Sequence, residues 1–100
     1  MEATVYIVRC ADGSYYTGLT RKEVEARVWE HNHLPDEKGY TAKRRPVELV
    51  FCETYERLTD AIERERQIKG WNRRKKEVLI AGSYETLPEL SRRNHLIDKK

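Results

Sequence analysis

The stretch from Thr4 to Gly18, TVYIVRCADGSYYTG, constrains the fold more than any other part of the chain. Its first half is rich in β-branched residues and its second half in tyrosine and threonine, both of which favour strands. Asp12-Gly13 between them is a strong signal for a chain reversal. The stretch therefore predicts a hairpin of two antiparallel strands, with Tyr6 on the first and Tyr16 on the second. Both tyrosines also fit an ordinary strand, so alone they indicate no function.

The composition is that of one small domain. The chain has 100 residues, enough for a single modest core, and we expect one domain over residues 1–92 followed by a polar tail over 93–100. Hydrophobic residues make up 38% and charged residues 37%, and no apolar run approaches the roughly 18 residues of a membrane span. Neither Cys10 nor Cys52 belongs to a CxxC pair. We therefore expect a cytoplasmic protein with two reduced core thiols and no membrane association.

Positive charge is concentrated in one segment. Residues 63–76 contain seven Lys or Arg against two Glu, whereas the net charge of the whole chain is only +3. A basic block on a nearly neutral body is typical of a surface that faces phosphate groups. A solvated helix end would carry the same local charge, so the block alone does not decide between the two.

The pattern after the hairpin predicts helices and one further strand. Thr20 and Glu23 form a capping box that is expected to start the first helix. The expected fold is α+β, a small three-stranded antiparallel sheet flanked by helices. The expected elements are a helix over 20–32, a loop over 33–45, a strand over 47–55, a helix over 59–69 ended by Gly70, a helix over 73–81 capped by Asn72 whose Val78, Leu79 and Ile80 face inward, and a short helix over 87–90.

Two helix faces contain polar residues where aliphatic ones are expected. Arg27 and His31 share a face of the first helix with Val24 and Val28. Glu65 falls within the apolar stripe of the second helix, where a buried carboxylate is costly unless it is paired or binds a cation. A salt bridge with Arg27 or with a neighbouring lysine is the structural alternative for Glu65.

Five residues from two strands and two helices are expected to point toward one surface of the sheet: Tyr6, Tyr16, Arg27, His31 and Glu65. Hydrolysis of a phosphodiester needs such a set. A carboxylate holds a divalent metal ion that bears the developing negative charge, a guanidinium binds the phosphate, and a base takes a proton from water. The combination, next to a basic block, points to hydrolysis of nucleic acid.

The same residues resemble a known family. Thr4-Val5-Tyr6 followed by Tyr16-Thr17-Gly18 resembles the paired signature of the GIY-YIG nuclease superfamily, with Tyr6, Tyr16 and Gly18 carrying the match. The chain from Thr4 to about Ile80 resembles the small, single-domain GIY-YIG proteins of bacteria. The downstream match consists of Arg27 with Glu30-His31-Asn32, Ala61-x-x-Arg64-Glu65, Ile68-Lys69-Gly70-Trp71 and Lys75-Lys76.

The resemblance implies a role for each matched residue. Glu65 would bind the metal ion, Mg²⁺ or Mn²⁺, and Arg27 would contact the scissile phosphate. Tyr6 and Tyr16 would flank the attacking water, one of them as a base. His31 stands where relatives carry a tyrosine or a histidine, and it is included among the catalytic residues.

The chain departs from the family pattern near its second glycine. The resemblance implies that Gly18 lets the backbone or the substrate come close. Many relatives carry a lysine just after this glycine, whereas this chain has Leu19 and Thr20. The segment before Arg27 is also one residue longer than usual. The extra residue would shift the position of Arg27 around the helix unless it lies in the turn near Arg21-Lys22.

Nucleic acid is the implied partner, DNA before RNA. Trp71 and Tyr40 are available to stack on an exposed base, although Trp71 equally fits a core anchor. The chain has no room for a separate DNA-recognition domain, so we expect structure-based or weakly sequence-based selectivity, or a protein partner for targeting. The residues expected to contact phosphates are Lys43, Arg45, Lys69, Arg73, Arg74 and Lys75.

Three interpretations follow. The first is a metal-dependent endonuclease with a role in DNA repair or recombination. The second is a nucleic-acid-binding module that keeps the fold and the basic surface with little catalysis. The third is a scaffold in which Arg27 and Glu65 form a buried ion pair. The tyrosine, arginine and glutamate set favours the first, and the missing lysine favours the second.

Overall fold

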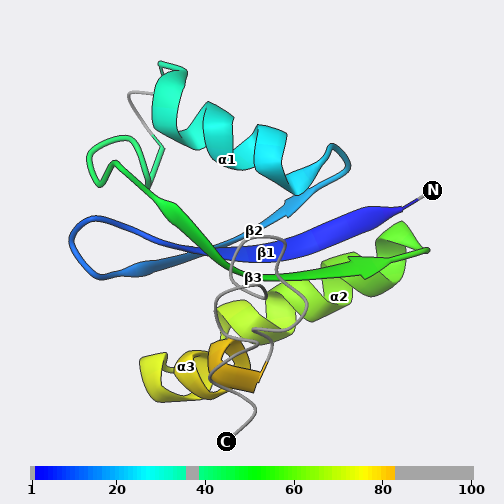
Figure 1. The fold of residues 1–100 in the computed structure, drawn as a ribbon. Helices are drawn as coiled ribbons and strands as arrows, with labels where there is room; N and C mark the ends of the chain where they lie inside the picture. The colour runs from blue at the N-terminus through cyan, green and yellow to red at the C-terminus, as the bar shows by residue number, and fades with distance from the viewer. Residues whose placement is uncertain (1, 36–38, 83–100) are drawn as a thin grey trace, which may run out of the picture.

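The architecture is a three-stranded sheet between helices. A computed structural model of the chain describes residues 2–35 and 39–82 (Figure 1). The predicted α+β fold with an antiparallel sheet is confirmed. The predicted helix over 87–90, the domain end at 92 and the tail over 93–100 lie outside the described residues. The elements are β1 (Ala3–Arg9), β2 (Tyr15–Thr20), α1 (Val24–His33), β3 (Glu48–Tyr55), α2 (Leu58–Lys69) and α3 (Arg73–Gly82).

The predicted hairpin forms the first two strands of the sheet. The strand order is β2-β1-β3, so β1 is central and β2 is an edge strand. Gly13 has a φ of 87°, which the turn requires and which glycine adopts without a steric penalty. The register places Tyr6 opposite Gly18 and Val8 opposite Tyr16. Because side chains alternate along a strand, Tyr6 and Tyr16 project from the same face.

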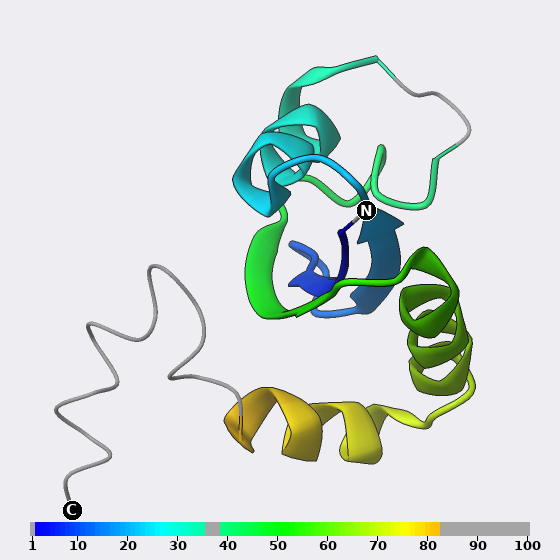
Figure 2. The same ribbon diagram turned by 90° about the vertical axis from the view of Figure 1, so that its right-hand side faces the viewer.

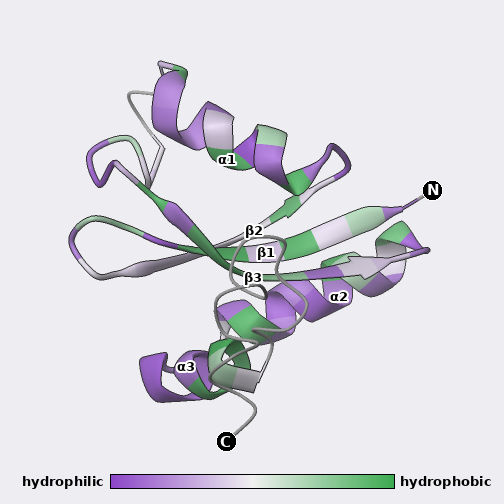
Figure 3. Cartoon of the chain, viewed as in Figure 1, coloured by the Kyte–Doolittle hydropathy of each residue, from purple (hydrophilic) through white to green (hydrophobic). Residues whose placement is uncertain are grey.

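Each face of the sheet has its own core. The first core lies between the sheet and α2 and α3, and the second lies between the sheet and α1 (Figure 2). Figure 3 shows hydrophobic residues concentrated on the strands, while α2 is mostly hydrophilic. The first core is formed by Ala3, Val5, Ile7, Val50, Phe51, Ala61, Ile68 and Ile80, and the second by Tyr6, Val8, Cys10, Val24 and Val47. Cys10 and Cys52 are free thiols, as predicted.

The start of α1 differs from the prediction. Thr20 does not cap the helix but is the last residue of β2, where it pairs with Thr4 of β1. Its hydroxyl accepts a hydrogen bond from the backbone N–H of Lys22 at 3.0 Å, and α1 begins at Val24. Strand pairing, which the local sequence does not reveal, therefore overrides the capping box. The predicted inward face of α1, with buried Val24 and His31, is preserved.

The inward face of α3 also differs from the prediction. Ile80 is buried and Leu79 is partly buried, but Val78 is 68% exposed. Successive helical residues are about 100° apart, so three in a row cannot all face one core. The predicted N-cap is confirmed, because Asn72 Oδ1 accepts the backbone N–H of Lys75 at 2.9 Å. Among the described residues, no helix is both long and apolar enough to span a membrane.

Candidate active site

The two signature tyrosines lie side by side on the α1 face of the sheet. Tyr6 is 1% exposed within the second core, and its ring centroid is 6.5 Å from that of the partly exposed Tyr16. Gly18 makes this packing possible. A Cβ atom at Gly18 would lie 2.4 Å from Tyr6 Oη and 2.5 Å from Tyr6 Cζ. Gly18 was expected to let the backbone or the substrate come close, whereas the group that approaches it in the structure is the Tyr6 side chain.

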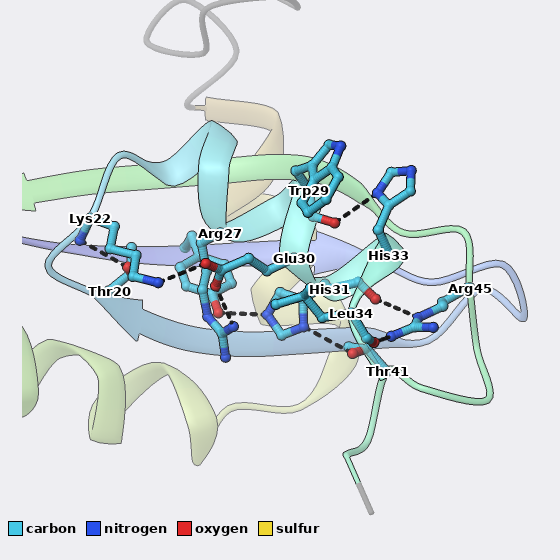
Figure 4. Close-up of polar contacts among 11 residues, drawn as sticks. Thr20, Lys22, Arg27, Trp29, Glu30, His31, His33, Leu34, Thr41 and Arg45 are labelled. Atoms are coloured by element: carbon cyan, nitrogen blue, oxygen red, sulfur yellow. Dashed lines mark hydrogen bonds and ion pairs between the residues drawn. The ribbon is translucent and has the colours of Figure 1, made fainter. Parts of the chain in front are cut away.

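His31 links Tyr6 to the loop that precedes β3. Tyr6 Oη lies 2.8 Å from His31 Nε2, and His31 Nδ1 lies 2.9 Å from Thr41 Oγ1. His31 and Thr41 are both buried, and Figure 4 shows the contact between their side chains. The Tyr16 ring meets the imidazole edge-on, with centroids 5.4 Å apart. The described structure thus joins a phenol, an imidazole and a hydroxyl into one hydrogen-bonded chain.

Arg27 lies one helical turn before His31. Its guanidinium donates to Glu30 Oε1 at 3.0 Å, and Glu30 Oε2 in turn accepts from Lys22 Nζ at 2.6 Å (Figure 4). Hydrogen bonds from Lys22 and Arg27 lower the pKa of the Glu30 carboxyl, which therefore remains charged. Glu30 thus fixes one edge of the Arg27 guanidinium, and Arg27 lines a cavity of about 160 Å³ that His31 and Arg45 also line.

Glu65 lies on α2, which packs on the face of the sheet opposite to α1. The expectation that all five residues point to one surface is wrong in this respect, because α2 covers the other face. However, α2 packs on β1 and on the edge strand β2, and the Glu65 charge still acts on the Tyr6 phenol. The structural alternative for Glu65 was a salt bridge with Arg27 or with a neighbouring lysine, and the described structure contains the lysine pair, whereas Arg27 pairs with Glu30. Glu65 pairs with Lys69 at 3.0 Å, with its side chain 17% exposed and that of Lys69 51% exposed.

The environment keeps Tyr6 protonated at neutral pH. Burial, reinforced by the neighbouring Tyr16 and by the Glu65 charge, raises the pKa of Tyr6 to about 12. Arg27 lowers the pKa of Tyr6, because a nearby positive charge favours the phenolate. Tyr6 therefore carries its proton in the resting protein, and His31 Nε2 is the imidazole nitrogen within hydrogen-bond distance of its hydroxyl.

The donor set suits a hard divalent cation bound through one carboxylate. Among residues 2–35 and 39–82, no three His, Cys, Asp or Glu side chains gather into a metal-binding group. Mg²⁺ characteristically binds one or two carboxylates and completes its octahedron with water and substrate phosphate oxygens. Glu65 fits that pattern, because its one ion-pair partner in the described structure, Lys69, is half exposed and held only by an i,i+4 contact.

The predicted phosphate-binding residues fall into two groups. Lys43, Arg74 and Lys75 are exposed, and Lys69 is half exposed. Two arginines instead hold the fold together. Arg45 donates to the backbone carbonyls of His31 and Leu34. Arg73 donates to the Gly13 carbonyl at 2.7 Å, pairs with Glu77 and lies over the Tyr15 ring, which fixes α3 to the hairpin turn.

The two aromatic residues singled out for stacking differ in position. Trp71 packs against the first core, with Arg64 and Lys75 over its ring, so it is the core anchor. Tyr40 is 42% exposed and stacks on Tyr16, with centroids 5.8 Å apart. Sequence reasoning gave no role to Thr41 or Glu30, although Glu30 stands beside His31 in the downstream pattern.

The fold and this cluster define a nuclease domain of the GIY-YIG class. A family model described as the GIY-YIG catalytic domain matches residues 2–77, and the chain belongs to this family of nucleic-acid endonucleases. A UPF0213 protein of Staphylococcus aureus (strain Mu50 / ATCC 700699) is 53% identical over 76 residues, which cover 76% of this chain and 90% of the relative. The chain is thus similar to small bacterial proteins of the UPF0213 group.

Two solution NMR structures share the fold. The UPF0213 protein of Bacillus halodurans superposes with a TM-score of 0.55 at 33% identity, over 91% of this chain and 98% of that one. A protein of E. faecalis gives a TM-score of 0.56 at 34% identity, over 82% of this chain and 85% of that one. Both likenesses extend over most of each chain, so they concern the whole domain.

Proposed function

We propose that this protein is a divalent-metal-dependent endonuclease that hydrolyses phosphodiester bonds in DNA. The observation that carries the proposal is the gathering of Tyr6, Tyr16, Arg27 and His31 on the α1 face of the sheet, with Glu65 close enough to influence Tyr6. Membership of the GIY-YIG family supports the reaction class.

Each residue has a chemical task in this proposal. Arg27 binds a non-bridging oxygen of the scissile phosphate through the guanidinium N–H groups that are not bonded to Glu30. Tyr6 and Tyr16 flank the attacking water. Tyr6 passes its proton to His31 Nε2 and takes one from the water, since a phenol whose pKa is near 12 is no base by itself at neutral pH.

Glu65 is the proposed metal ligand. When bound, Mg²⁺ or Mn²⁺ would neutralise negative charge that develops on the phosphate and the leaving oxygen. GIY-YIG nucleases generally use divalent metal ions, which supports this assignment. Glu65 lies on a regular helix. Its partner Lys69 is half exposed, so a metal ion can displace the lysine ammonium from the carboxylate.

We propose that exposed lysine and arginine side chains hold the nucleic acid through its backbone. Phosphate contacts carry no sequence information, which supports weak or structure-based selectivity and leaves room for a targeting partner. They also do not separate DNA from RNA, so both belong in the test. The proposed contacts are Lys43, Lys69, Arg74 and Lys75, with Arg45 and Arg73 contributing from positions where they also support the fold.

The test is a cleavage assay on labelled DNA and RNA in single-stranded, duplex and branched forms, with and without Mg²⁺ or Mn²⁺. Divalent-dependent cleavage of DNA that is abolished in Glu65→Gln is the expected result. Glu63→Gln is the matched control, because Glu63 is an exposed carboxylate on the same helix. Activity that survives Glu65→Gln would exclude the metal role, and cleavage of RNA alone would exclude DNA as the substrate.

A binding module with little catalysis is the second candidate. The observation that favours it is the combination of a deeply buried, protonated Tyr6 with Leu19 at the position where many relatives carry a lysine. This candidate predicts salt-dependent binding to nucleic acid. It also predicts no cleavage of any substrate with either metal ion, so the same assay decides between the two.

A further inference from the structure

The segment over residues 39–45 is attached to the site through two consecutive side chains. Tyr40 stacks on Tyr16, and Thr41 contacts His31 Nδ1 at 2.9 Å. The segment is itself fastened to the rest of the domain. Arg44 pairs with Asp12 at 3.1 Å and its carbonyl accepts the N–H of Ala11, while Arg45 binds the His31 carbonyl (Figure 4). Thr41 is therefore held in place independently of its contact with the imidazole.

We propose that Thr41 is a positioning residue that fixes the tautomer and orientation of His31. In this arrangement His31 Nδ1–H donates to Thr41 Oγ1, and the lone pair of Nε2 points at the Tyr6 hydroxyl. The inference rests on the nuclease function proposed above, and it adds a residue to which neither the sequence pattern nor the family match gives a role.

The tautomer of His31 follows from the donors and acceptors that its buried neighbours provide. Tyr6 is 1% exposed, so its hydroxyl proton needs an acceptor inside the protein, and His31 Nε2 at 2.8 Å is well placed. A neutral imidazole that accepts at Nε2 carries its proton on Nδ1. That proton needs an acceptor in turn, and Thr41 Oγ1 supplies one in a buried position.

This arrangement allows proton transfer without a change of tautomer. The Tyr6 O–H bond breaks, its proton moves to His31 Nε2, and the phenolate takes a proton from the attacking water as the new phosphorus–oxygen bond forms. The bond from phosphorus to the leaving oxygen breaks, the leaving oxygen takes a proton from solvent, and the imidazolium later returns its proton to solvent. Throughout these steps, His31 Nδ1–H keeps its hydrogen bond to Thr41 Oγ1. Among the described residues, the titratable and charged groups near His31 include Tyr6 and Tyr16 from the sheet, Arg27 and Glu30 from its own helix, and Arg45 from the segment over 39–45.

Three variants test the inference. Thr41→Val keeps the shape and removes the hydroxyl, while Thr41→Ser keeps the hydroxyl. Thr17→Val is the matched control, since Thr17 is also buried but lies on the other face of the sheet and its Oγ1 has no partner in the described structure. Thermal melts of all three establish that each variant is folded.

The first measurement is independent of any nuclease activity. Long-range ¹H–¹⁵N NMR of the imidazole nitrogens reports which one is protonated. We expect Nδ1–H in the parent, in Thr41→Ser and in Thr17→Val, and a shift toward Nε2–H in Thr41→Val. An Nε2–H tautomer in the parent overturns the proposal without any variant. An unchanged tautomer in Thr41→Val overturns it as well.

The second measurement is the pH profile of cleavage. We expect Thr41→Val to lower kcat by about 10–100-fold, the scale seen when a partner that orients a histidine is lost. KM should stay within a few-fold, the profile should change its acidic limb, and Thr41→Ser should restore activity. Equal kcat in Thr41→Val and the parent would refute the role. A parent that cleaves nothing would refute the nuclease function, while the NMR result would still decide the tautomer.

Discussion

Gly18→Ala offers a direct test of how the site is packed. In a strand, alanine is normally the better residue by about 0.5–1 kcal/mol, and Gly18 does not have a positive φ that would oppose a side chain. On backbone grounds alone, the substitution should stabilise the fold. The structure predicts the opposite, because the new Cβ would lie 2.4 Å from Tyr6 Oη and 2.5 Å from Tyr6 Cζ.

The expected cost has two parts. The Tyr6 ring must move by about 1 Å inside a packed core, and such overpacking costs about 1–3 kcal/mol. The movement also breaks the 2.8 Å hydrogen bond to His31, and a buried polar group left without its partner costs about 1–3 kcal/mol. Together they predict a loss of about 2–5 kcal/mol, which lowers the melting temperature of a domain of this size by roughly 10–30 °C.

Circular dichroism melts and urea titrations measure the effect, with Gly70→Ala as the control. Gly70 ends α2 in an αR conformation, and a Cβ there would meet its nearest atom at an ordinary 3.6 Å. In a Tyr6→Phe background, Gly18→Ala should cost about 1–3 kcal/mol less, because the hydrogen bond is already absent. A Gly18→Ala protein that melts at or above the parent would refute the packing argument.

Four further outcomes are expected. Glu65→Gln should leave the melting temperature nearly unchanged, because its pair with a half-exposed lysine contributes only about 0.3–0.5 kcal/mol, and should abolish Mn²⁺ binding in calorimetry; a large drop in stability with metal binding intact would contradict the metal role. Arg27→Ala should lower cleavage by about 10²-fold with affinity within a few-fold, whereas lost affinity with unchanged turnover would make Arg27 a simple binding residue. Thr17→Val should raise the free energy of unfolding by about 1 kcal/mol, since it removes a buried hydroxyl without a partner, and a lower value would show that the hydroxyl is satisfied. Burial raises the pKa of both Tyr6 and Tyr55 to about 12 from 10.0, so their contribution to stability is complete below about pH 10 and is lost as the pH rises toward 12; melts across this range should show the loss, and Tyr6→Phe should reduce it.

The sequence was sufficient where structure is determined by neighbouring residues. The hairpin follows from β-branched residues before Asp12-Gly13 and from tyrosine and threonine after it, and the end of α2 follows from Gly70. The start of α1 did not follow, since Thr20 satisfies a capping pattern and a strand pattern equally. Only its pairing with Thr4, sixteen positions away in the hairpin, decides for the strand. Val78 was misplaced because apolar character was given more weight than helical phase.

The site was predicted in its residue types more fully than in its geometry. Arg27 and His31 stood out because a helix face that packs on a sheet seldom carries both. No local pattern shows that Glu65 approaches from the opposite face, because this depends on which side of the sheet the chain crosses after β3. Thr41 was missed for a related reason. A threonine in an irregular loop gives no periodic signal, and its partner His31 becomes its neighbour only through the fold.

The edge position of β2 has a consequence for association of the protein with itself. An edge strand offers unpaired backbone groups to any other strand, and proteins commonly cover such edges. Here a cover would also bury Tyr16 and the approach to Arg27. The chain instead follows β2 directly with the exposed charges of Arg21 and Lys22. These charges discourage strand addition while leaving the edge open. Neutralising those two charges should therefore promote aggregation through β2 more than it disturbs the fold.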